Sequence, residues 1–166
     1  SPTPEMLDGI DVLLVDYQDI GARYWTYVST MTLAMEASAE QGVPVVILDR
    51  PNPITGAVQG NVLNAAFATF VGRYPMAMRH GMTLGELARY YQGENGIGGE
   101  LHVVPVEGWR RDMPFAETGL PWNLVKTPFE RIIKTSSLSP DFNEKHHTYC
   151  GLLSSMHSWG LVNARY

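Results

Sequence analysis

Acidic residues follow two short apolar runs of the sequence, and they are the first candidates for chemistry. Residues 10–16 read I-D-V-L-L-V-D and residues 43–48 read V-P-V-V-I-L, each typical of a buried strand. Asp16 ends the first run, Asp49 follows the second, and Asp19 lies just beyond Asp16. Because ligands bind beyond the carboxyl ends of strands in open α/β sheets, these acids are candidate catalytic residues. An Asp after a strand also often caps the next helix, which is the structural alternative.

Polar and aromatic side chains accompany these acids in the combination that a sugar site requires. Carboxylates and amides bind hydroxyl groups, and the C–H face of a sugar ring packs on aromatic rings. The candidate binding residues are Gln18, Arg23, Tyr24, Tyr27, Arg50 and Asn52. The alternative is again structural, since the D-R-P segment that contains Asp49 and Arg50 could form only an ion pair in a turn.

Arg79 and His80 precede a predicted helix and complete the set of candidates. Residues 83–86 read T-L-G-E, a capping box that opens a helix reaching to about residue 91 or 92. His80 is a candidate acid or base, or a hydrogen-bonded loop residue. The sequence has no phosphate-binding loop, dinucleotide fingerprint or nucleophile elbow, and its one Cys has no evident partner. We therefore exclude phosphate, hydride and acyl-enzyme chemistry, and we expect no cofactor and no metal.

An α/β architecture is predicted to position these residues. Apolar residues recur at helical spacing over residues 26–41, and Gly42 is placed to end that helix before the strand of residues 43–48. A strand, a helix and a strand in succession define a βαβ unit, so the first two strands should be parallel neighbours. Residues 49–56 form a loop because of their prolines, and residues 101–106 are a third strand candidate.

The composition changes near Trp122. Residues 1–122 contain seven Arg, no Lys and fourteen acidic residues, for a net charge of −7. Residues 123–166 contain three Lys, two Arg and three acidic residues, for a net charge of +2. The total of −5 provides no basic surface for nucleic acid, and no apolar run approaches the roughly 18 residues of a membrane span. Residues 123–166 are either a basic extension or a junction artefact such as a shifted reading frame.

Five motifs follow one another over the first part of the chain. They are VDYQDIGARYWTYVSTM (15–31), LDRPNPITG (48–56), FVGRYP (70–75), RHGMTLGELA (79–88) and GWRRDM (108–113). In this order they resemble the exo-β-N-acetylmuramidases of the NamZ type. The resemblance implies a two-domain, Rossmann-like glycoside hydrolase with its active site in a cleft. Such an enzyme would release terminal N-acetylmuramic acid from peptidoglycan fragments during cell-wall recycling, in an extracellular or periplasmic location.

Two departures from the family pattern predict that this chain is an incomplete piece of such an enzyme. It lacks a Pro-Glu-His-Gly segment, which we expect to supply a catalytic glutamate in the family. The family's Pro-Ser-Pro-Asn and Gly-Arg-Gly-Thr segments do not follow Trp122. We therefore divide the chain into a partial muramidase region, residues 1–122, and an atypical tail, residues 123–166. We expect the chain on its own to be inactive.

Glycoside hydrolysis normally needs two carboxyl groups, about 5 Å apart for retention or 6.5–9.5 Å for inversion. Asp16 and Asp49 are predicted at neighbouring strand ends, and adjacent strands lie about 4.8 Å apart. Asp19 competes with Asp16 for the same role. Arg50 would keep one acid ionised or, as we favour, bind the lactyl carboxylate of muramic acid, a role that is also open to Arg79. The alternative function is a non-catalytic peptidoglycan-binding or carbohydrate-binding α/β domain.

Overall fold

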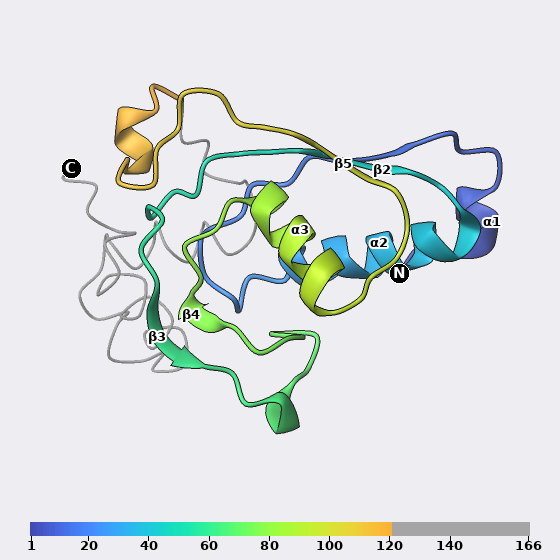
Figure 1. Cartoon of the computed structure of the whole chain (residues 1–166), viewed down its shortest axis with the longest axis horizontal. Coiled ribbons are helices and arrows are strands. Elements are labelled where there is room, and N and C mark those ends of the chain that lie inside the picture. The colour runs from blue at the N-terminus through green and yellow to red at the C-terminus, as the bar shows by residue number, and fades with distance from the viewer. Residues whose placement is uncertain (121–166) are drawn as a thin grey trace, which may run out of the picture. The chain divides into compact units, whose positions relative to one another are not determined.

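The computed structural model of the chain describes residues 1–120, and the residues Ser1–Thr118 form one compact unit (Figure 1). Its helices are α1 (Pro4–Leu7), α2 (Tyr27–Gln41) and α3 (Leu84–Glu94), with short 3-10 turns η1 (Ala65–Phe67) and η2 (Phe115–Glu117). Its strands are β1 (Leu13–Val15), β2 (Val45–Leu48), β3 (Gln59–Val62), β4 (Ala77–Arg79) and β5 (Leu101–Val104). The described part of the chain contains no helix with the length and apolar character of a membrane span.

The predicted βαβ unit is present. Strand β1 pairs in parallel with β2, with Val15 opposite Ile47, and β2 pairs in parallel with β5. Helix α2 connects the first two strands, as the apolar spacing predicted. The strands are shorter than the apolar runs, because β1 begins only at Leu13 and β5 ends at Val104, before Pro105, which has no N–H to donate to a ladder.

The predicted end of α2 and the predicted start of α3 are confirmed, whereas α3 reaches Glu94, beyond the predicted end at about residue 91 or 92. Gly42 ends α2 in the left-handed conformation, with φ 69°, and its N–H donates to the carbonyl groups of Ser38 and Ala39. At the start of α3, the Thr83 hydroxyl accepts from the Glu86 N–H while the Glu86 carboxylate accepts from the Thr83 N–H. This reciprocal pair is the predicted capping box.

The core lies between one face of the three-stranded sheet and the two long helices, which are on the same side of the strands (Figure 1). Met31 of α2, Ile47 of β2 and Leu87 of α3 are fully buried there. Burying a side chain of this size stabilises the fold by about 1.5–3 kcal/mol. On the other face of the sheet Leu14 is 60% exposed and Val104 is 52% exposed. A parallel sheet normally has both faces covered, whereas these apolar side chains of the second face are exposed in the part of the chain that the structure describes.

An antiparallel pair, β3 and β4, was not predicted. The pairing of the two strands is irregular: Gln59 lies opposite Arg79 and Val62 opposite Ala77, with a shift of register between them. All four residues of β3 are exposed, so the strand has no apolar alternation that a sequence pattern could detect. Helix α1 was not predicted either, because its four residues are too few to show an apolar spacing. The predictions for residues 123–166, including the tail itself, lie outside the described residues.

Candidate functional site

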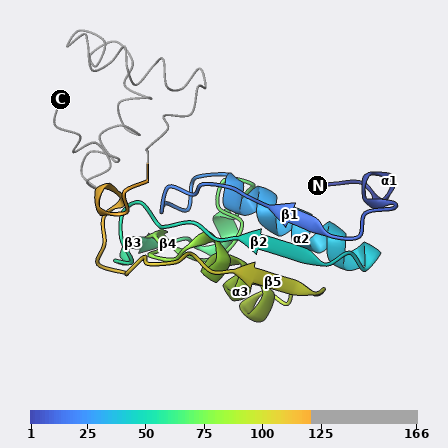
Figure 2. The ribbon, with the colours of Figure 1, turned by 90° about the horizontal axis from the view of Figure 1, so that it is seen from above.

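The segments that leave the three parallel strands meet at one end of the sheet. Figure 2 shows the arrows of β1, β2 and β5 pointing toward the end at which β3 and β4 lie. After β1, the Gln18 side chain donates to the Pro51 carbonyl in the loop after β2 (3.1 Å). In that loop the Gly56 N–H donates to the carbonyl of Arg111, which follows β5 (2.6 Å). These segments therefore lie together at the carboxyl ends of the strands. We call residues 16–27, residues 49–56 and the residues around Arg111 the loop cluster.

Asp16 and Arg50 form an ion pair across the ends of β1 and β2. The Arg50 Nε lies 2.6 Å from Asp16 Oδ1, and the two side chains are 43% and 48% exposed, respectively. The hydrogen bond from Arg50 lowers the pKa of the Asp16 carboxyl, and the same contact raises the pKa of Arg50. Asp16 is thus an accessible, ionised carboxylate near neutral pH.

Asp49 is directed at the start of α3. Its Oδ1 accepts from the Gly85 N–H (2.7 Å) and from the Arg50 N–H (3.0 Å). Its Oδ2 accepts from the Thr83 hydroxyl (2.8 Å). A Cβ added at Gly85 would lie 2.9 Å from the Asp49 carboxyl carbon, so only Gly permits this approach. Asp49 therefore fills the structural role of a helix cap, while the Asp16 carboxylate accepts from Arg50.

Asp19 and His80 are buried together. The two side chains are 5% and 0% exposed, and His80 Nε2 lies 3.1 Å from Asp19 Oδ2. The Gly21 N–H donates to Oδ2 of Asp19 (2.7 Å), while Oδ1 is buried with no hydrogen-bond partner among the described residues. His80 Nδ1 accepts from the Met82 N–H (3.2 Å), while His80 Nε2 is buried and forms no hydrogen bond among the described residues.

Two other predicted binding residues hold the loops in shape. Asn52 is 1% exposed; its Oδ1 accepts from the Ile54 N–H (3.0 Å) and its Nδ2 donates to the Met82 carbonyl (2.9 Å). Arg23 donates from Nη1 to the Asn61 carbonyl (2.6 Å) and to the Met76 carbonyl (2.7 Å). These contacts connect the segment after β1 to the β3–β4 pair.

Aromatic rings gather beside the segment that follows β1. The ring centroids of Tyr17 and Tyr27 lie 5.3 Å apart, and those of Trp25 and Tyr27 lie 5.1 Å apart. All three side chains are half-buried. The Tyr24 hydroxyl is buried and has no hydrogen-bond partner among the described residues. We call Tyr17, Trp25 and Tyr27 the aromatic cluster; its half-exposed rings are of the kind that pack on a sugar face.

Arg79, the last residue of β4, lies against the segment after β1 through a bridge to Ala22. Its guanidinium donates to Gln59 Oε1 (3.0 Å) and to Thr55 Oγ1 (2.7 Å). Burial lowers the pKa of Arg79. Sequence reasoning missed both of these acceptors. Thr55 lies in the LDRPNPITG motif, which was its one signal, whereas Gln59 lies outside the motifs.

Arg111, which the sequence reasoning did not select, links the segment after β5 to the same loops. It contacts the Glu86 carboxylate and donates to the Gly81 carbonyl (2.9 Å). Its place in the GWRRDM motif was the available signal. Among residues 1–120, no group of three or more His, Cys, Asp or Glu side chains is arranged to hold a metal ion.

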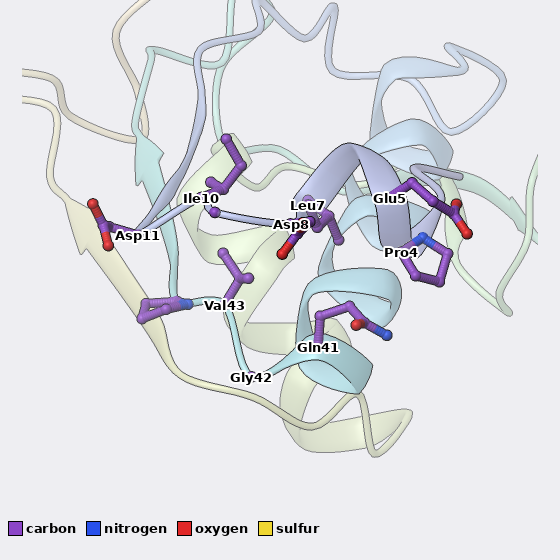
Figure 3. A pocket seen from close by; sticks show the side chains of 11 residues that line it. Pro4, Glu5, Leu7, Asp8, Ile10, Asp11, Gln41, Gly42 and Val43 are labelled. Atoms are coloured by element: carbon purple, nitrogen blue, oxygen red, sulfur yellow. The ribbon is translucent and has the colours of Figure 1, made fainter.

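One cavity of the described residues lies away from this loop cluster. It has a volume of about 650 Å³ and lies among α1, the end of α2 and the residues that precede β1 and β2 (Figure 3). Acidic side chains at its rim come from Glu5, Asp8 and Asp11. This is the amino end of the parallel strands, opposite the end at which α/β sheets bind ligands.

The fold and the loop cluster define an α/β domain whose polar and aromatic side chains gather at the carboxyl ends of parallel strands. The family model described as "Exo-beta-N-acetylmuramidase NamZ, N-terminal" matches residues 1–128. The chain belongs to this family, as the five motifs indicated.

Individual relatives agree with this assignment. A peptidoglycan beta-N-acetylmuramidase NamZ from Bacillus subtilis (strain 168) is 48% identical over 124 residues, which cover 74% of this chain and 30% of the relative. Two crystal structures of DUF1343 family proteins from Bacteroides fragilis are also similar. One has a TM-score of 0.71 at 46% identity, and the match covers 77% of this chain and 34% of the Bacteroides fragilis chain. The other has a TM-score of 0.65 at 36% identity, over 68% of this chain and 33% of its own. The chain thus spans about a third of the length of these relatives.

Proposed function

We propose that this chain forms part of the sugar-binding cleft of an exo-β-N-acetylmuramidase, which releases terminal N-acetylmuramic acid from peptidoglycan fragments outside the cytoplasm. The observation that carries the proposal is the 48% identity with the Bacillus subtilis muramidase over 124 residues. The family match over residues 1–128 includes the loop cluster, which lies at the end of the sheet where α/β proteins bind ligands.

Asp16 is our candidate for the ionised carboxylate of the reaction. A glycosidase needs one carboxylate that is ionised, as nucleophile or base, and one carboxyl group that is protonated. The ion pair with Arg50 keeps Asp16 in the ionised form, and the side chain is 48% exposed, so a substrate can reach it. Asp49 and Asp19 are less suited, because the first caps α3 and the second is buried against His80.

The aromatic cluster is our candidate for the surface that packs on the sugar ring. Its half-exposed rings belong to the segment that follows Asp16, so the apolar face of a bound pyranose could lie on them while its glycosidic bond points toward Asp16. Gln18, Arg23, Asn52 and His80 support this surface through the loop contacts described above.

The first experiment offers the full chain a fluorogenic N-acetyl-β-muramide and measures binding and release. We expect binding without release, because the sequence lacks the Pro-Glu-His-Gly segment that we expect to supply a catalytic glutamate in the family. A chain that releases the fluorophore would contradict our prediction that it is inactive alone. A chain that does not bind the glycoside would contradict the proposed site.

A second experiment separates a part of an enzyme from a non-catalytic sugar-binding domain, the alternative function. The aligned segment of the Bacillus subtilis relative is replaced by that of this chain, and hydrolysis is measured. We expect an active hybrid, whose kcat falls by about a hundredfold or more with Asp16→Asn at little change in KM. Asp112→Asn, at an exposed acid, is the control and should leave kcat unchanged. A folded but inactive hybrid would favour the binding domain.

A further inference from the structure

Arg79 is one of three arginines in residues 1–120, with Arg23 and the exposed Arg89, that have no acidic partner. Four others contact a carboxylate: Arg50, Arg73, Arg110 and Arg111. Arg79 has no Asp or Glu within ion-pair distance in residues 1–120, and it donates only to the neutral oxygens of Gln59 and Thr55. Its positive charge therefore has no counter-charge within the described fold.

This unpaired charge is also partly removed from water. Burial lowers the pKa of Arg79, and its Nε is buried without a hydrogen-bond partner among the described residues. Only two of the five N–H groups of the guanidinium donate to a described acceptor. Keeping a charge from water without a partner costs free energy, which a bound anion would offset. Arg23 also lacks an acid partner, but its contacts are to two backbone carbonyls that fasten a loop.

The loop after β2 holds Arg79 in place through an unusual backbone conformation. Thr55 has φ 70°, and it is the only non-glycine residue with positive φ in the part of the chain that the structure describes. For a β-branched residue this conformation is strained, and such strain concentrates at ligand-binding and active sites. It places Thr55 Oγ1 2.7 Å from Arg79 Nη2, so the guanidinium is oriented before any ligand binds.

The position of Arg79 fits a ligand in the loop cluster. Its bridge to Ala22 joins β4 to the segment that carries the aromatic cluster, and Thr55 belongs to the loop that begins beside Arg50. Arg50 itself already has Asp16 as its counter-charge. Of the two arginines considered for carboxylate recognition, Arg79 is therefore the one with its charge still available.

We propose that Arg79 binds the carboxylate of an acidic sugar and sets the preference of the site for N-acetylmuramic acid over its neutral counterpart, N-acetylglucosamine. The inference rests on the proposed function, because it places a muramic acid residue in the loop cluster. The sugar's lactyl carboxylate accepts charge-assisted hydrogen bonds from the free N–H groups of the guanidinium. Arg50 then acts on Asp16 and not on the substrate carboxylate.

Calorimetric titration of the full chain with methyl glycosides tests this inference. The ligands are the β-glycosides of N-acetylmuramic acid, of its lactyl amide, which is uncharged, and of N-acetylglucosamine. We expect the acid to bind about tenfold to a hundredfold more tightly than either neutral sugar, the range for lost charge-assisted hydrogen bonds. The comparison of acid with amide requires no variant, so it does not depend on whether a substituted chain folds.

Variants locate the responsible group. Arg79→Met should remove most of the preference for the acid and leave the affinity for N-acetylglucosamine within about twofold. Arg89→Met, at an exposed position of α3, is the matched control and should keep the preference. Arg50→Met should keep it as well. Loss of the preference in Arg50→Met, or its retention in Arg79→Met, would overturn the inference.

The outcomes separate the two proposals. If the wild-type chain binds none of the three sugars, the proposed function fails. If it binds all three equally, or if Arg79→Met weakens acid and neutral sugars alike, the muramic acid site stands and the role of Arg79 is refuted.

Discussion

Asp16, Asp49 and Asp19 have the same carboxyl group in three different surroundings, and we expect their substitution to differ accordingly. Asp49→Ala removes the acceptor for the Thr83 hydroxyl and for the Gly85 N–H at the start of α3. We expect the free energy of unfolding to fall by about 2 kcal/mol, the cost of a lost cap with unpaired donors. Asp16→Ala, which removes a surface ion pair, should cost about 0.2–1 kcal/mol. Urea unfolding of both variants measures the difference, and equal losses would contradict these assignments.

The pKa of Asp16 provides a second prediction for a single residue. Because Arg50 lowers that pKa in the folded chain, the ion pair stabilises the fold at pH values above the unfolded pKa of about 4. The contribution is lost as the pH falls through the lower folded pKa. NMR titration of the Asp16 carboxyl should show its pKa rising in Arg50→Met. An unchanged Asp16 pKa would contradict the ion pair.

The candidate acids could be selected from the sequence, but their partners could not. A polar residue after a buried strand is a local signal, and it identified Asp16 and Asp49. The partner of Asp49 is Thr83, 34 positions later, and nothing local indicates that α3 begins beside β2. The acceptors of Arg79 are similarly distant, since Gln59 belongs to a strand that has no apolar alternation.

At the level of elements, the capping box of α3 has more partners than its sequence pattern implies. The Thr83 hydroxyl accepts from the Glu86 N–H and also donates to Asp49, so it connects the helix to the end of β2. Thr83→Ala should lower the free energy of unfolding by about 1–2 kcal/mol, while Thr83→Ser should be nearly neutral. Thermal unfolding followed by circular dichroism checks both variants. A Ser variant as unstable as the Ala variant would indicate that the hydroxyl is not the stabilising group.

The elements with strong periodic or punctuation signals were predicted, and those without were not. The helix of α2 and its end at Gly42, the capping box and the parallel pair of β1 and β2 all follow from local patterns. The pair of β3 and β4 is stabilised by contacts distant in sequence, such as the donation of Arg23 to the Asn61 carbonyl of β3 (2.6 Å). A local sequence pattern does not indicate contacts between residues that are far apart in the sequence.

At the level of the whole chain, the exposed apolar side chains on the second face of the sheet should affect behaviour in solution. Leu14 and Val104 are exposed there beside the partly buried Val46 and Leu48, and apolar patches of this kind promote association. We expect the chain to self-associate at high concentration in sedimentation experiments, and Leu14→Thr with Val104→Thr to reduce the association. Val62→Thr, at an exposed position of β3, is the control. A chain that stays monomeric at all concentrations would contradict this prediction.

The most direct test of the central claim, that muramic acid binds at the carboxyl ends of the parallel strands, is an NMR titration of the isotopically labelled full chain at low concentration. The methyl β-glycoside of N-acetylmuramic acid is added and the backbone amide signals are followed. We predict the largest shifts for residues 16–27 and 49–56, with the amides of Glu5, Asp8 and Asp11 at the opposite cavity unchanged. Shifts confined to that cavity, or no shifts at all, would contradict the claim.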